Sequence, residues 1–156
     1  MIFNKWVLLA VMPLVAQGVW ADTYTCPASL EVKEQLLSDP VGWSTMFTTS
    51  AGEITYMEGR EASDTLKLVQ VTLYSGEPKD DAQLSPDNAD DLSEDEEGDS
   101  IWSLGSAEEQ QKTPIYLACD YGSSISVFKK ITTPAKSCAW HFKPDADNNI
   151  LNCTSY

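Results

Sequence analysis

Four cysteines constrain the fold of this 156-residue chain more than any other feature. They are Cys26, Cys119, Cys138 and Cys153, and all of them follow an apolar N-terminal segment that is typical of export. An even number of cysteines in an exported protein favours disulfides. None has the CxxC spacing of zinc sites or thioredoxin-like redox centres. We therefore expect two structural disulfides rather than metal ligation or redox catalysis.

A hairpin at the end of the chain favours one of the pairings that four cysteines allow. The sequence pattern predicts strands at residues 137–142 and 149–154, with a turn between them. In such a hairpin Cys138 lies opposite Cys153, at a spacing that a disulfide can bridge. The other two pairings stay open on sequence grounds. The preferred pairing is Cys26–Cys119 and Cys138–Cys153.

The N-terminal segment has the three parts of a secretory signal peptide. Met1–Lys5 carries one positive charge, Trp6–Ala16 is apolar, and Val19–Ala21 offers a cleavage site. The apolar run has about half of the roughly 20 residues that a membrane-spanning helix needs. We predict cleavage after residue 21, a mature chain that begins at Asp22, and a periplasmic location in a Gram-negative cell. The residues before Cys26 do not fit a lipoprotein signal, so no lipid anchor is expected.

The net charge of the chain limits its partners. It is −14, and loss of residues 1–21, which hold one Lys and no acid, makes it −15. Phosphate backbones and anionic membrane surfaces repel such a chain, so neither is expected as a partner. A cationic protein would associate faster instead. Residues 80–99 hold many of the acids and no basic residue, and we predict that this stretch is a mobile loop.

Residues 22–156 are long enough for one domain, and their strand patterns predict a mainly β fold. Leu66–Tyr74 is the clearest strand, because it is rich in β-branched residues and places Val69, Val71 and Leu73 on one face.

The remaining patterns complete the predicted fold class. Leu30 and Val32 alternate with Glu31 and Lys33 in a strand-like pattern, although a helix over Leu30–Leu37 is an alternative. Later strands at 101–104, 114–121 and 125–131 lead into the final hairpin and indicate an antiparallel meander. We expect an antiparallel, sandwich-like fold that is stabilised by disulfides and admits a short helix.

Residues that could support catalysis are few. His141 is the single histidine, and its place between Trp140 and Phe142 is typical of an ordinary half-exposed strand residue. The acidic stretch does not match a calcium-binding EF-hand loop, because Glu96 occupies the position that requires Gly. No carboxylate pair has a spacing that selects it for sugar hydrolysis. We therefore expect no enzyme activity, no cofactor and no metal.

Several short motifs lie along the mature chain: Cys26-Pro27, Val41-Gly42-Trp43, Leu73-Tyr74-x-Gly76-x-Pro78, Leu84-x-Pro86, Trp102-x-Leu104, Tyr116-x-x-Cys119-x-Tyr121, Cys138 and Cys153. Together they resemble a family of small periplasmic proteins of Gram-negative bacteria, some of which lie in type VI secretion regions and are regarded as immunity proteins. The resemblance covers most of the mature chain. A weaker resemblance, limited to Tyr116–Gly122 and Ile125–Val127, links the chain to periplasmic inhibitors of c-type lysozyme.

These resemblances and the charge predict a protein that binds and blocks another protein. The expected target is a cationic cell-wall-degrading enzyme, either a type VI effector or a lysozyme-like enzyme. The alternatives are a structural envelope protein and a small-ligand binder with a pocket lined by Trp43 or Trp140. The predicted contact surface combines acidic residues with nearby aromatic residues that we expect to be exposed: Asp90, Asp91, Glu94, Asp95, Glu96, Glu97, Asp99, Trp102 and Tyr121.

Overall fold

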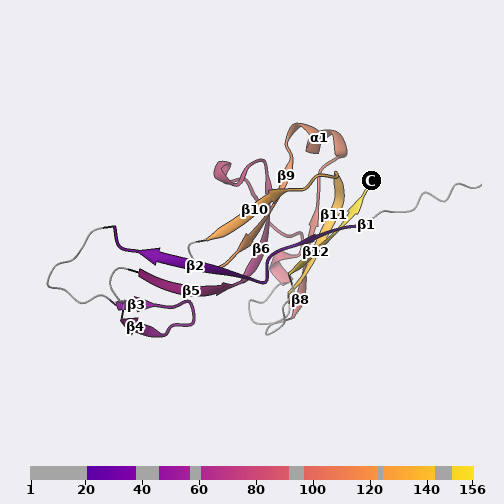
Figure 1. Ribbon diagram of the computed structural model, residues 1–156. Helices are drawn as coiled ribbons and strands as arrows, with labels where there is room; N and C mark the ends of the chain where they lie inside the picture. The colour runs from indigo at the N-terminus through magenta and orange to yellow at the C-terminus, as the bar shows by residue number, and fades with distance from the viewer. Residues whose placement is uncertain (1–20, 38–45, 57–60, 92–96, 123–124, 143–148) are drawn as a thin grey trace, which may run out of the picture.

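A computed structural model describes residues 21–37, 46–56, 61–91, 97–122, 125–142 and 149–156. Its strands are antiparallel throughout, so the predicted mainly β fold is confirmed. Two four-stranded sheets form a sandwich, with side chains from both of them in one core (Figure 1).

The first sheet has the strand order β1-β12-β11-β8, and the second has the order β10-β9-β6-β7. The first consists of β1 (Ala21–Thr25), β12 (Ile150–Ser155), β11 (Ala135–Phe142) and β8 (Gly98–Ser103). The second consists of β10 (Ser126–Lys130), β9 (Ile115–Asp120), β6 (Gln70–Ser75) and β7 (Gln83–Leu84).

The core of the sandwich follows from period-two alternation along the strands. Leu73 on β6, Leu117 on β9 and Leu151 on β12 have no exposed surface, and they come from both sheets. Val71 is likewise buried, but Val69, which was expected on the same face, is 57% exposed. The expected strand at 66–74 is interrupted before β6 begins.

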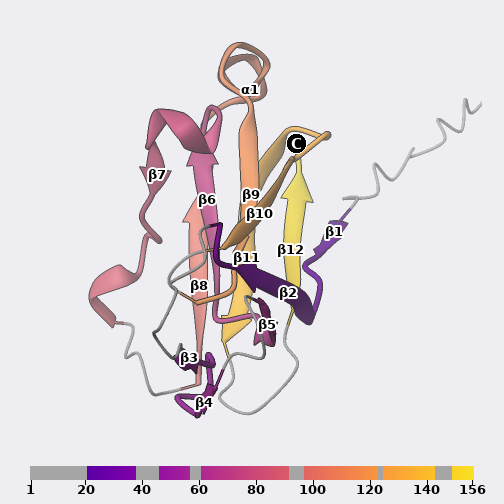
Figure 2. The ribbon, with the colours of Figure 1, turned by 60° about the vertical axis from the view of Figure 1, so that its left-hand side comes forward.

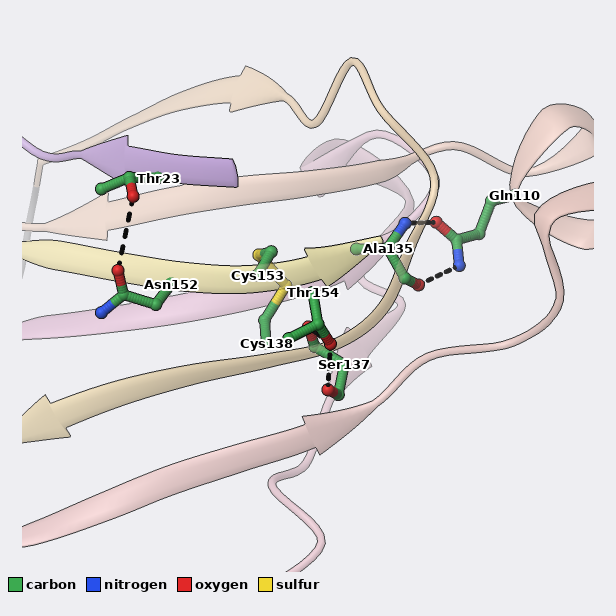
Figure 3. Close-up of a disulfide and its surroundings, with 8 residues drawn as sticks. All are labelled: Thr23, Gln110, Ala135, Ser137, Cys138, Asn152, Cys153 and Thr154. Carbon is green, nitrogen blue, oxygen red and sulfur yellow. Dashed lines mark hydrogen bonds between the residues drawn. A yellow bond between two sulfur atoms is a disulfide. The ribbon is translucent and has the colours of Figure 1, made fainter. Parts of the chain in front are cut away.

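Two disulfides stabilise the sandwich, in the pairing that the sequence analysis preferred. Cys138 and Cys153 lie directly opposite each other on β11 and β12, with their Cα atoms 4.1 Å apart (Figure 3). Cys26 follows β1 in the chain and is bonded to Cys119 on β9, so this disulfide joins the two sheets. The predicted signal peptide falls on residues 1–21, of which 1–20 lie outside the described residues.

A second part of the molecule extends away from the sandwich, and we call it the arm (Figures 1 and 2). It contains a two-stranded ribbon of β2 (Ser29–Gln35) and β5 (Glu61–Lys67). The short hairpin of β3 (Met46–Thr48) and β4 (Ile54–Tyr56) lies at its far end (Figure 1). The strand interpretation of residues 30–33 is therefore confirmed by β2, and the helical alternative for residues 30–37 is wrong.

The expected meander of later strands is also wrong. The chain crosses from β8 in the first sheet to β9 in the second, and back from β10 to β11. The first crossing contains the helix α1 (Ala107–Lys112), which begins with a capping box between Ser106 and Glu109. The hydrogen bond from the Ser106 hydroxyl keeps the pKa of the Glu109 carboxyl below its usual value.

Candidate partner-binding surface

Part of the acidic stretch lies along the outer edge of β8, and we call residues 83–91 the strap. The Trp102 indole Nε1 donates to the Leu84 carbonyl at 3.0 Å. The Asp87 amide donates to the Ile101 carbonyl at 2.7 Å, and the Asp87 carboxylate accepts from the Ser103 amide at 2.7 Å. The strap therefore occupies hydrogen-bonding groups of β8 that a sheet edge would otherwise leave open.

Asn88 aligns the strap with the start of β8. Its side-chain amide donates to the Asp99 carbonyl at 2.6 Å and accepts from the Ile101 amide at 3.0 Å. A short 3₁₀ turn, η2 (Ala89–Asp91), follows directly, and both of its acidic residues are exposed. A comparable turn, η1 (Pro78–Asp80), follows β6 at the other side of β7.

This arrangement brings exposed carboxylates from the strap and from the beginning of β8 to one side of the molecule. We call this set the acidic edge. Glu94, Asp95 and Glu96, which the sequence analysis also assigned to the contact surface, lie outside the described residues. The acidic edge consists of Asp87, Asp90, Asp91, Glu97 and Asp99.

His141 on β11 joins two members of the acidic edge. Its Nδ1 lies 2.7 Å from Asp99 Oδ1 and its Nε2 lies 3.0 Å from Glu97 Oε1. These hydrogen bonds, first from Asp99 and then from Glu97, raise the pKa of His141 above its usual value. A protonated imidazole donates from both ring nitrogens, so it suits two carboxylate partners. The expectation of an ordinary half-exposed strand residue did not include this link to Asp99 and Glu97.

The two aromatic residues expected on the contact surface are buried instead. Trp102 is 3% exposed and Tyr121 is 1% exposed. Trp102 points into the core from β8 while its neighbour Ile101 points outward. The Tyr121 hydroxyl donates to the Pro27 carbonyl, and burial raises the pKa of this phenol. Both side chains pack in the sandwich, so the expectation that they are exposed is wrong.

The sequence also raised the possibilities of a tryptophan-lined pocket, a metal site and a membrane-spanning segment. Trp140 is 6% exposed and packs in the core, whereas Trp43 lies outside the described residues. Within the parts of the chain that the structure describes, no three His, Cys, Asp or Glu side chains are grouped to hold a metal ion. Among the same residues, no helix is long and apolar enough to cross a bilayer.

The protein is a disulfide-linked β-sandwich whose acidic edge is held by hydrogen bonds from Asn88 and His141. The family model of the type VI secretion system Tli immunity protein matches residues 61–154. The chain therefore belongs to this family, which confirms the resemblance noted from its motifs. No curated protein and no solved structure matches the chain. As a member of this family, the chain is an immunity protein whose partner is a type VI effector.

The matched region covers the strap, the acidic edge and every strand from β5 to nearly the end of β12. The strands β1 to β4 precede it, so most of the arm lies outside the match.

Proposed function

We propose that this chain neutralises its cognate effector in the periplasm by binding it and occluding its active site, and that the acidic edge attracts a cationic surface of that effector. The observation that carries the proposal is the fixed position of the acidic edge. Asn88 and His141 hold carboxylates from two chain segments together, against their mutual repulsion. Family membership supplies the effector as the partner.

The electrostatic part of the proposal follows from the sign and density of the charge. A protein with a net charge of −14 repels anionic surfaces and attracts cationic ones over about a Debye length. Carboxylates at an interface rim act mostly on the association rate, because they orient the partner before close contact. A cationic effector would therefore bind faster at low salt than at high salt.

The proposed target is a cell-wall-degrading enzyme. Enzymes that work on an anionic wall benefit from a positive surface, and that surface complements this chain. The predicted export signal and the two disulfides support a meeting in the periplasm, because that compartment is oxidising. The proposed role is non-catalytic: the chain blocks the effector and is not consumed.

Association kinetics with the effector encoded beside this chain's gene test the role of the acidic edge. The neutralising double variant Asp90→Asn with Asp91→Asn should slow association several-fold at low ionic strength, as is typical for charges at an interface rim. The dissociation rate should stay nearly unchanged. The matched control is Asp80→Asn with Asp81→Asn, which removes the same charge at the end of η1 and at the residue that follows it. Equal effects of the two double variants would refute steering by the acidic edge.

Peptidoglycan digestion tests the class of target. The effector alone should clear a peptidoglycan suspension, and a stoichiometric amount of the exported, disulfide-bonded chain should stop the reaction. If the effector binds the chain but leaves peptidoglycan intact, the immunity role stands and the cell-wall assignment fails. If no effector binds, the immunity role for this pair fails.

A further inference from the structure

Within the described residues, contact between the arm and the core of the sandwich is concentrated at the base of the arm. At its base, Leu30 and Val32 on β2 pack against the core, and Leu66 on β5 is 9% exposed. Towards the far end, Glu34 lies opposite Ala62 and the ribbon leaves the sandwich (Figures 1 and 2). A two-stranded ribbon is marginally stable alone in water, so an element of this kind gains from a partner that covers it.

The hairpin of β3 and β4 is anchored on the ribbon. The backbone amide of Ser50, in the turn of the hairpin, donates to the Asp64 carboxylate on β5 at 2.7 Å. This hydrogen bond lowers the pKa of Asp64, and Asp64 also accepts from the Thr65 amide at 2.8 Å. The Ser50–Asp64 hydrogen bond therefore ties the turn of the hairpin to β5.

One face of this hairpin carries exposed apolar side chains. In the register of β3 and β4, Thr48 lies opposite Ile54, and Met46 is two residues from Thr48, so all three share a face. Met46 is 63% exposed and Ile54 is 69% exposed, whereas Phe47 on the opposite face is partly buried. Single exposed apolar residues are common, but Met46 and Ile54 lie on one face of the same hairpin and form a small apolar surface that a partner could cover.

The charge of the arm indicates the chemistry of its partner. Lys33 Nζ lies 2.5 Å from Glu61 Oε2, so this lysine is paired within the ribbon. Glu34 is exposed on β2, and Glu53 is exposed directly before Ile54 in the chain. A complementary surface is an apolar depression bordered by Lys or Arg, because basic groups there would pair with these carboxylates. The charged residues of the described arm are Glu31, Lys33, Glu34, Glu53, Glu61, Asp64 and Lys67.

The position of the arm relative to the family match suggests its role. Immunity proteins that share a fold must each distinguish one effector from others, and such discrimination needs contacts that differ between members. The strands β2, β3 and β4 lie outside the region that the family model matches, whereas the sandwich lies mostly inside it.

We propose that the arm is the element with which this immunity protein recognises its own effector, and that the exposed face of β3 and β4 docks into an apolar depression with a basic border. The inference rests on the proposed function, since it takes the effector as the partner. Contact through Met46 and Ile54 would supply short-range affinity, while Glu53 would pair with the basic border. In this scheme the acidic edge raises the association rate, and the arm lowers the dissociation rate of the complex.

Calorimetric titration of the exported, disulfide-bonded chain with the effector encoded beside it tests the arm. Met46→Ser with Ile54→Ser should weaken binding by about 30-fold or more, as expected for central contacts of an interface. Glu53→Lys, which alters an exposed turn residue, should weaken binding without any loss of apolar contact. Phe128→Ser is the matched control, because Phe128 is 58% exposed but lies on β10 of the sandwich.

Thermal melts of each variant establish that the fold is retained, and the Glu53→Lys variant still tests the proposal if the apolar variant fails to fold. Tight binding by the unaltered chain with undiminished binding by both arm variants overturns the arm assignment alone. The same holds if Phe128→Ser weakens binding as much as the arm variants do. Failure of the unaltered chain to bind overturns the proposed function, and the arm assignment with it.

Discussion

His141 lies directly opposite Asp99 across the ladder between β11 and β8, and its Nδ1 is 2.7 Å from the Asp99 Oδ1. The second ring nitrogen lies 3.0 Å from Glu97 Oε1. One imidazole therefore links two carboxylates in the most acidic part of the chain. Its protonation connects the position of the acidic edge to pH.

The stability of the protein should fall as pH rises through the folded-state pKa of His141. Because Asp99 and Glu97 raise this pKa, the folded state holds the proton more tightly than the unfolded chain does. The stabilisation is complete below the unfolded value of about 6.5 and is lost above the folded value. The melting temperature of the unaltered chain should therefore exceed that of His141→Gln at pH 5.5, with the gap closing towards pH 8.5.

The single histidine of the chain makes this prediction directly measurable. Nuclear magnetic resonance titration of its imidazole should give a pKa above the usual value, and Asp99→Asn should move the pKa back down. A gap in melting temperature that stays constant from pH 5.5 to 8.5 would contradict the linkage.

The two disulfides should contribute unequally to stability. Cys26–Cys119 closes a loop with a sequence separation of 93, whereas Cys138–Cys153 closes one with a separation of 15. Chain entropy predicts losses of about 4.5 and 3 kcal/mol respectively when each pair is replaced by Ser. Urea unfolding of the two double variants measures both free energies. A larger loss from the Cys138 pair would show that strand packing, rather than loop length, dominates.

The sequence predicted the fold where its signals are local. The final hairpin follows from two strand patterns and a turn, and this geometry places Cys138 beside Cys153. The continuous pattern over 66–74 did not reveal its interruption, which depends on distant partners. The Leu68 amide donates to Ala28 near β2, and the Val69 amide donates to Asp120 at the end of β9. The chain changes its pairing partner at this point, and no local signal marks the change.

The candidate site was predictable in charge but not in geometry. Alternation in 101–104 shows that Ile101 and Trp102 face opposite ways, but it does not say which of them is buried. His141 was missed because its partner Asp99 is 42 residues away and becomes its neighbour only through the pairing of β8 with β11. A signal for α1 was present, since Ser106 and Glu109 have the spacing of a capping box.

Gln110 should be a stability determinant although it lies on a short helix. Its side chain is 7% exposed, donates to the Ala135 carbonyl at 2.6 Å and accepts from the Ala135 amide at 3.0 Å (Figure 3). Gln110→Ala would leave both buried backbone groups of Ala135 without these partners, at a cost of about 2–4 kcal/mol. Gln111→Ala, at the exposed neighbouring position, should change stability by less than about 0.5 kcal/mol. Similar denaturation midpoints for the two variants would contradict this role.

Asn88 should control the order of the strap more than the stability of the whole protein. Asn88→Ala removes the hydrogen bonds to the Asp99 carbonyl and the Ile101 amide. Their combined loss should lower the free energy of unfolding by about 1–2 kcal/mol, because the site is partly exposed. Hydrogen exchange at the Ile101 amide should accelerate, because this amide loses its acceptor, while exchange at the Leu117 amide in the core should follow only the small change in global stability. Association with the effector at low salt should also slow, since the acidic edge loses its alignment. Unchanged exchange at Ile101 would show that the backbone bond between Asp87 and Ile101 is sufficient to hold the strap.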